Sequence, residues 1–280
     1  MSKNDNKGCF LLDNRPIGVF DSGLGGLSVI KELQLVLPNE NIVYFGDTGR
    51  VPYGTRSNDT IVKYARQDER FLLSHNVKLI IAACGTVSSV AAFTENELPV
   101  PFIEVVSPTA EAAVKATRNG RIGVLGTTAT INSNSYKNKM LSIRSDLTVV
   151  QKACPLFVQL VENGWIDRND EVTVATAKRY LAPLIEQEVD TVILGCTHFP
   201  AIQNIIGDIL GSGTTLINSG QQAALKAESY LLQNDALGFG GQHKFYVSDK
   251  AESFASTAGI LLGSDIGDSV ETINIEDFGD

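Results

Sequence analysis

The sequence predicts an α/β protein with two pseudo-symmetric domains, each a mostly parallel sheet flanked by helices. From Pro16 onward, short apolar runs of strand length alternate with longer amphipathic stretches, which is typical of parallel strands joined by covering helices. Three segments of the first half also recur in the same order in the second half, which indicates a duplicated unit. With 280 residues, 43% of them hydrophobic, the chain is long enough for one large or two smaller domains.

The predicted strands are short runs rich in Val, Ile and Leu, at residues 17–20, 42–45, 79–83, 102–105, 122–125, 148–150, 192–194, 215–217 and 244–247. Between the first two, apolar residues recur at helical spacing from Leu27 to Leu37, and the pattern stops at Pro38. A second helical pattern begins near Ile61, after Ser57, which is a typical N-cap residue.

The internal repeat carries the prediction of two related domains. Three pairs of segments match in order: 17–22 with 122–127, 77–86 with 189–198, and 101–104 with 216–219. Buried strands of any origin look alike, because all are rich in aliphatic residues. Here, however, the second pair also has matching ends, Cys-X-Thr in the first half and Cys-Thr-X in the second. We expect a first domain of residues 15–107 plus 219–280, and a second domain of residues 108–218.

Composition and charge narrow the range of partners. The formal net charge of −9 speaks against a nucleic-acid partner, which would need clustered Lys and Arg. No apolar run approaches the ~20 residues that cross a bilayer, and residues 1–14 lack the apolar core of a secretory signal. We therefore expect a cytoplasmic protein with a small-molecule substrate, no membrane partner, and free thiols at Cys9, Cys84, Cys154 and Cys196. The sequence leaves a homodimer open.

Two cysteines stand where the matched strands end. Cys84 and Cys196 each follow a predicted strand and precede a predicted helix, over 86–93 and 200–210. Open α/β sheets bind ligands at the carboxyl ends of their strands, so we expect the two thiols on opposite walls of one interdomain cleft. N–H groups at a helix N-terminus stabilise thiolates and bind carboxylates. We therefore expect lowered thiol pKa values and an anionic amino acid as the ligand.

A pair of thiols across a cleft suits proton transfer at a carbon atom. Racemisation needs a base on one face of Cα and an acid on the other, with roles that exchange with direction. Polar residues follow both cysteines, which argues against the inert core role that we assign to Cys154. His198 is a candidate for adjusting the proton of Cys196. Because only Arg50 and Arg56 flank these motifs, we expect backbone amides and hydroxyls to do most of the binding.

Two other chemistries stay open at this point. The two cysteines and His198 are ligand types for zinc, although Cys-X-His is not a usual zinc spacing. The glycine-rich loop at 21–26, followed by a helix, a strand and Asp47, resembles part of a dinucleotide-binding fingerprint, although Ser28 stands where the third glycine belongs. The first alternative predicts a metal site, and the second predicts a nicotinamide-dependent dehydrogenase.

Five motifs follow one another in the chain: FDSGLGG at 20–26, FGDTGRVPYG at 45–54, AACGT at 82–86, TTAT at 127–130 and LGCTHFP at 194–200. Together they resemble the glutamate racemases of the aspartate/glutamate racemase superfamily. The resemblance implies a cofactor-independent, metal-free isomerase that makes D-glutamate for peptidoglycan, with catalytic residues Cys84, Cys196, Asp21 and His198. It implies substrate-binding positions at Asp21, Ser22, Tyr53, Gly54, Gly85, Thr86, Thr127, Thr130, Glu162, Thr197 and His198.

One residue departs from the family pattern. The family motif reads Cys-Asn-Thr, whereas Gly85 follows Cys84 here, so an amide expected to contact the substrate is missing. Backbone N–H groups can still bind, at a loss of about 1 kcal/mol for one hydrogen bond. His198, where aspartate racemases tend to carry Glu, favours glutamate. Three hypotheses result: a glutamate racemase, an aspartate racemase with the same mechanism, and a catalytically silent amino-acid-binding or inhibitor protein, which Gly85 alone invites.

Overall fold

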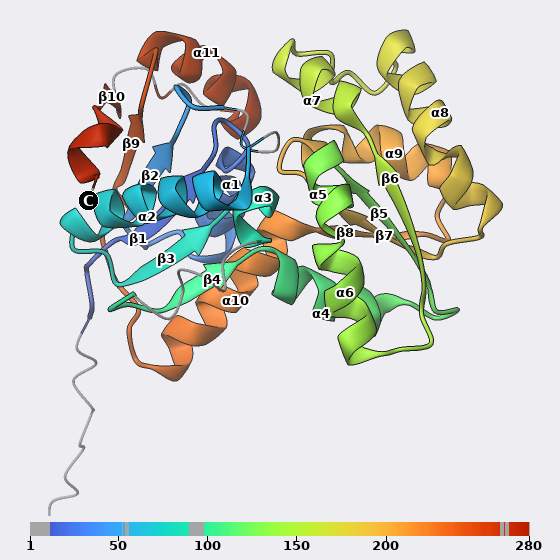
Figure 1. Ribbon diagram of the computed structural model, residues 1–280, viewed down its shortest axis with the longest axis horizontal. Helices are drawn as coiled ribbons and strands as arrows, with labels where there is room; N and C mark the ends of the chain where they lie inside the picture. Colours follow the sequence, from blue (N-terminus) through green and yellow to red (C-terminus); the bar gives the residue numbers. More distant parts are fainter. Residues whose placement is uncertain are drawn as a thin grey trace, which may run out of the picture.

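Ten strands form two parallel sheets in the computed structural model, which describes residues 12–51, 53, 56–89, 98–263, 266 and 269–279 (Figure 1). The first sheet has the strand order β10-β9-β2-β1-β3-β4, and the second has the order β6-β5-β7-β8. The strands are β1 (Ile17–Asp21), β2 (Ile42–Gly46), β3 (Leu79–Ala82), β4 (Phe102–Glu104), β5 (Arg121–Gly126), β6 (Thr148–Ala153), β7 (Thr191–Leu194), β8 (Thr215–Asn218), β9 (His243–Val247) and β10 (Val270–Thr272). We call each sheet with its helices a lobe, the six-stranded one being the first.

Helices cover both faces of each sheet. They are α1 (Leu27–Val36), α2 (Asn58–Ser74), α3 (Gly85–Ser88), α4 (Val106–Ala116), α5 (Thr128–Ser133), α6 (Ser135–Ile143), α7 (Pro155–Glu162), α8 (Glu171–Glu186), α9 (Gln203–Leu210), α10 (Ser219–Gln233) and α11 (Ala251–Leu262), with 3-10 helices η4 (Phe199–Ile202) and η6 (Ile275–Phe278). Two residues of β1 face opposite sides of the first sheet. Ile17 belongs to an apolar cluster with residues of α1 and α10, and Phe20 belongs to another cluster with residues of α2. In the second lobe, Val192 clusters with α8, and Ile193 clusters with α4 and α6. None of the helices in the described ranges is long and apolar enough to cross a membrane.

All nine predicted strands are present, with ends that differ by at most a few residues. Strand β10 was not predicted, because it is an edge strand whose residues are largely exposed and form no apolar run. Ser57 caps α2 as predicted, because its side chain accepts a hydrogen bond from the N–H of Thr60 at 3.3 Å. The helix predicted over 200–210 begins as the 3-10 helix η4, and only α3 represents the one predicted over 86–93, since residues 90–97 lie outside the described part.

The two lobes share one strand order, which is what the sequence repeat predicts. Strands β2-β1-β3-β4 of the first lobe correspond to β6-β5-β7-β8 of the second, and β9 and β10 extend the first sheet. Phe20 pairs with Ala82, and Leu125 pairs with Leu194, in the same relative register. We propose that the domain boundaries follow the sheets, with residues 15–107 plus 219–280 in one domain and 108–218 in the other.

The carboxyl ends of the central strands of both sheets face the gap between the lobes (Figure 1). Helix α10 packs against α1 of the first lobe and against α4 of the second. One apolar cluster contains residues from both sheets, among them Val19 of β1 and Leu194 of β7. This shared core holds the ends of β1, β3, β5 and β7, and therefore the loops that follow them, in one place.

A buried ion pair lies at the opposite end of β3 from Cys84. The Lys78 Nζ is 2.6 Å from Glu40 Oε2, and the two side chains are 1% and 2% exposed. The same ammonium group donates hydrogen bonds to the carbonyl oxygens of Asp13 and Ala236, each at 2.7 Å. The ammonium group of Lys78 therefore makes two hydrogen bonds and one ion pair, which tie together three separate chain segments.

Candidate active site

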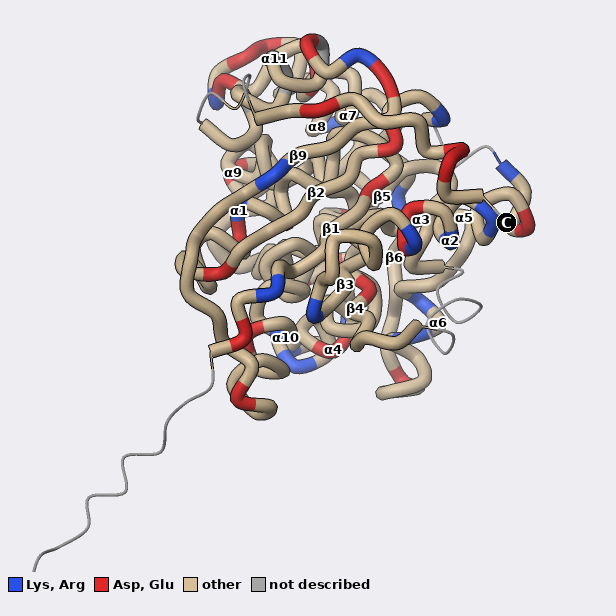
Figure 2. The backbone as a smooth tube through the Cα atoms, turned by 90° about the vertical axis from the view of Figure 1, so that its left-hand side faces the viewer, with Lys and Arg blue, Asp and Glu red and all other residues tan. Residues whose placement is uncertain are grey.

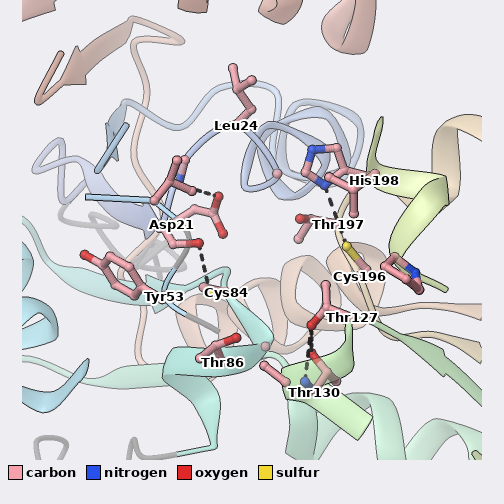
Figure 3. Close-up of a pocket in the computed structure, with 18 of the residues that line it drawn as sticks. Asp21, Leu24, Tyr53, Cys84, Thr86, Thr127, Thr130, Cys196, Thr197 and His198 are labelled. Atoms are coloured by element: carbon pink, nitrogen blue, oxygen red, sulfur yellow. Dashed lines mark hydrogen bonds between the residues drawn. The ribbon is translucent and has the colours of Figure 1, made fainter. Parts of the chain in front are cut away.

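A cavity of about 310 Å³ lies between the lobes, at the carboxyl ends of the strands (Figure 3). Its lining includes every predicted site residue that the structure describes: Asp21, Ser22, Tyr53, Cys84, Gly85, Thr86, Thr127, Thr130, Glu162, Cys196, Thr197 and His198. The predicted position Gly54 lies outside the described residues, as does Cys9. Cys84 and Cys196 come from different lobes and line the same cavity, whereas Cys154 is fully buried and does not.

Helix α7 contributes a wall that the sequence analysis largely missed. Pro155, Val158 and Gln159 line the cavity together with Glu162, the only residue of this helix that was predicted. These four positions are spaced i, i+3, i+4 and i+7, so they lie on one face of the helix. Once Glu162 is placed at the cavity, this helical spacing predicts that the other three residues face the cavity as well.

The first wall places a thiol beside a carboxylate. Cys84 follows β3, is 7% exposed, and its Sγ lies 3.4 Å from Ser22 Oγ in a hydrogen bond. Asp21 is the last residue of β1, and its Oδ2 accepts a hydrogen bond from the N–H of Gly23 at 3.0 Å. Burial raises the pKa of Asp21, against the opposing effect of His198 and the backbone N–H groups of the loop.

The expectation of a lowered thiol pKa is wrong for Cys84. Burial, and then the charge of Asp21, raise the pKa of this thiol to about 11. The hydrogen bond to Ser22 and the N–H groups of Thr86 and Val87 act in the opposite direction but are outweighed. The positive end of the four-residue helix α3 is too weak to offset desolvation beside a carboxylate. Cys84 therefore rests as a neutral thiol that can serve as an acid.

The second wall places a thiol beside an imidazole. Cys196 Sγ lies 3.6 Å from His198 Nδ1, and His198 Nε2 lies 3.0 Å from Glu162 Oε1. Burial alone would lower the pKa of His198, but its hydrogen bonds to Cys196 and Glu162 outweigh this and raise the pKa to about 10. At neutral pH the ring is therefore charged and links the sulfur of Cys196 to a carboxylate.

Apart from His198, the polar groups that line the cavity in the described part of the chain include no basic side chain. Thr127 caps α5, and its Oγ1 lies 3.0 Å from Thr130 Oγ1, so two hydroxyls from the second lobe stand together at the cleft (Figure 3). No Lys or Arg within the described ranges lines the cavity. Arg50 is instead bound to the aspartates behind the Tyr53 wall, and Arg56 is exposed. Hydroxyls and backbone N–H groups are thus the donors available to an anionic ligand.

The geometry also bears on the two alternative chemistries. Among the residues that the structure describes, no group of three or more His, Cys, Asp or Glu side chains is arranged to hold a metal ion. Asp47, on which the dinucleotide hypothesis depends, is fully buried and bound by Arg50, Tyr53 and Ser248. Gly25 of the 21–26 loop is needed for close packing and not for binding a dinucleotide. A Cβ at this position would stand 1.8 Å from Thr197 Oγ1 of the facing lobe. Gly25 therefore allows the lobes to approach each other.

Fold and site together define a class of protein with two α/β lobes that share the same strand order. Each lobe contributes one thiol to the cleft between them. The chain belongs to the Asp/Glu/hydantoin racemase family, which it matches over residues 31–227. It is 41% identical, over 258 residues, to a glutamate racemase of Geobacter metallireducens, covering 91% of this chain and 95% of that protein.

Solved structures of similar proteins agree with this membership. A glutamate racemase isoform from Bacillus anthracis superimposes with a TM-score of 0.87 at 35% identity, covering 93% of this chain and 98% of that one. A glutamate racemase from Francisella tularensis, solved in complex with D-glutamate, superimposes with a TM-score of 0.85 at 36% identity, covering 95% and 100%. The likeness therefore extends over both lobes.

Proposed function

We propose that this protein is a glutamate racemase, which interconverts L- and D-glutamate by moving the α-proton between Cys84 and Cys196 without a cofactor. One observation supports the proposal above all others: the two thiols follow matched strands of related lobes and line one small cavity. The names of the similar proteins and the D-glutamate in one of their structures support glutamate as the substrate. D-glutamate made in this way would serve peptidoglycan synthesis.

In the proposed mechanism, the substrate lies with Cα between the two sulfur atoms. One thiolate takes the α-proton, and the thiol on the opposite face gives a proton to the resulting carbanion, which inverts the centre. Asp21 is placed to exchange a proton with Cys84, and His198, held by Glu162, with Cys196. Hydroxyls of Ser22, Thr86, Thr127, Thr130 and Thr197 and backbone N–H groups would bind the two carboxylates.

Small molecules are the partners that the structure fits best. In the view of Figure 2, the Lys and Arg positions of the described residues are scattered among Asp and Glu positions along the backbone. A cytoplasmic location stays a prediction from the sequence, and a homodimer stays a possibility that the sequence leaves open.

The test is a cofactor-free assay on both acids. We expect L- and D-glutamate each to racemise, as followed by circular dichroism, and each to exchange the α-hydrogen in D₂O. We expect kcat/KM for glutamate to exceed that for aspartate, and the reverse order would reassign the substrate. Binding of D-glutamate without any racemisation would instead support the silent binding protein.

We expect the alkaline limb of the pH profile to lie unusually high. Because the two enantiomers have equal free energies, kcat/KM has one pH profile for both directions. The acid forms of Cys84 and His198 have pKa values of about 11 and about 10, so activity should persist at pH 9 and fall as pH rises through 10 to 11. Glu162→Gln removes a group that raises the pKa of His198 and should move the limb to lower pH. A native limb near the ordinary thiol pKa of ~8.5 would contradict this assignment.

Gly85→Asn should strengthen substrate binding. A Cβ at this position would meet Thr130 Oγ1 at 3.4 Å and the Gly195 carbonyl oxygen at 3.5 Å, which are ordinary van der Waals contacts for this atom. One added hydrogen bond of about 1 kcal/mol lowers KM for glutamate about fivefold. Gly85→Ala is the control, because it adds the Cβ without the amide. Equal KM values for the two variants would show that the amide contributes nothing.

A further inference from the structure

A cluster of buried ionisable side chains stands behind the cleft wall that Tyr53 forms. The Tyr53 hydroxyl is within hydrogen-bond distance of Asp47, and it lies 3.0 Å from Asp68 Oδ2. Figure 3 shows this hydroxyl directed away from Cys84, so a ligand in the cleft meets the Tyr53 ring. The side chains of both aspartates are fully buried. Two carboxylates in such a place repel each other unless a cation lies between them.

Arg50 supplies that cation. Its Nε donates to Asp47 at 2.6 Å, and its second terminal nitrogen donates to Asp68 at 3.1 Å. Its first terminal nitrogen donates to Gln67 at 2.5 Å, and the guanidinium lies 4.0 Å from the centroid of the Tyr64 ring. A planar fork of donors reaches several acceptors at once, which a lysine cannot reproduce. One side chain therefore joins the loop after β2 to helix α2.

The loop held in this way is part of the active-site wall. Val51 and Tyr53 line the cavity, and Val51 Cγ2 is 3.3 Å from where a Cβ of Gly23 would stand, so the loop packs on the backbone that binds Asp21. The N–H of Asp47 also donates to the carbonyl oxygen of Asp21 at 3.0 Å. A displaced loop would thus move both the Tyr53 wall and the carboxylate beside Cys84.

The carboxyl-terminal helix η6 closes the same cluster from outside. Glu276 Oε2 accepts a hydrogen bond from Gln67 at 3.2 Å, and its Oε1 lies 3.5 Å from Arg50. The Glu276 side chain is 60% exposed, so its pairing with Arg50 contributes little energy. The buried aspartates Asp47 and Asp68 therefore contribute most of the energy that holds Arg50 in place.

We propose that Arg50 is a positioning residue for racemisation. It holds residues 47–51 and Tyr53 of the loop after β2, and through them Asp21, in the geometry in which Cys84 exchanges its proton. Arg50 does not line the cavity, so it acts through its neighbours and touches no substrate. This inference rests on the proposed glutamate racemase activity.

The test uses Arg50→Lys, which keeps the charge but cannot bridge both aspartates. We expect the variant to fold and to lose roughly 10–100-fold in kcat/KM, because small misplacements of reacting groups have effects of that size, with the loss mainly in kcat. Tyr53→Phe should cost much less in the Arg50→Lys background than in the native protein, since both changes disturb one cluster. Glu276→Gln should stay close to native.

Lys78→Met is the matched control, because it removes another buried cation at the far end of the sheet. We expect it to lower stability without changing kcat/KM of the folded protein. Native kcat/KM for Arg50→Lys, or effects of Arg50→Lys and Tyr53→Phe that simply multiply, would overturn the positioning role. A native protein without racemase activity would refute the proposed function separately. The inference would then be decided by calorimetric titration with D-glutamate, where unchanged affinity in Arg50→Lys refutes it and weakened affinity supports it.

Discussion

Cys84→Ser and Cys196→Ser are each expected to lower kcat/KM for glutamate racemisation by about 10²–10⁴-fold, because each removes the acid–base group on one face of the substrate. The hydroxyl of serine is a far weaker acid than a thiol, and it occupies nearly the same volume. The measurement is circular dichroism of purified variants whose folding is checked by their thermal transitions. Racemisation near the native rate in either variant would contradict the two-thiol mechanism.

Exchange in D₂O gives the same variants a second readout. Each variant keeps one thiol, so each should still exchange the α-hydrogen of the one enantiomer whose Cα–H bond faces that thiol. The preferred enantiomer should be opposite for Cys84→Ser and Cys196→Ser. Cys154→Ala is the control, because Cys154 is fully buried and does not line the cavity, and its kcat/KM should stay close to native. The same preferred enantiomer in both serine variants would place the two sulfurs on one face.

The second large effect concerns stability. Lys78→Met should lower the free energy of unfolding by about 3–5 kcal/mol, because it leaves the Glu40 carboxylate buried without its cation. Two carbonyl oxygens, of Asp13 and Ala236, also lose their donor. Urea denaturation checks the prediction through a shift of the midpoint at constant m-value.

The paired variant separates charge burial from packing. Adding Glu40→Leu to Lys78→Met removes the uncompensated charge, and we expect it to restore part of the lost stability. A single Lys78→Met variant as stable as the native protein would show that the ion pair contributes nothing. Activity per folded molecule should remain native, since Lys78 precedes β3 and Cys84 follows it.

The positions of the two active-site thiols followed from local patterns, whereas most of the other site residues followed from the family resemblance. Cys84 and Cys196 are each preceded by a short aliphatic run, and strand ends of parallel sheets converge, so a few adjacent residues sufficed to place both thiols. The cavity wall from α7 was harder to predict from the sequence. Val158 and Gln159 belong to an ordinary amphipathic pattern, which does not show that they line the cavity unless Glu162 is known to face it. Edge strand β10 left no apolar pattern at all.

The sequence by itself determined the two-lobed parallel architecture, the cysteines at matched strand ends and the polar loops around them. These features depend on hydrophobic periodicity and on strand ends, and both can be recognised from a few neighbouring residues. Only the tertiary structure decided the protonation of the site. The raised pKa of Cys84 depends on burial and on Asp21 from another strand, and that of His198 depends on Glu162, far away in the chain. Desolvation and charge act through space, so they emerge only when distant segments have been brought together.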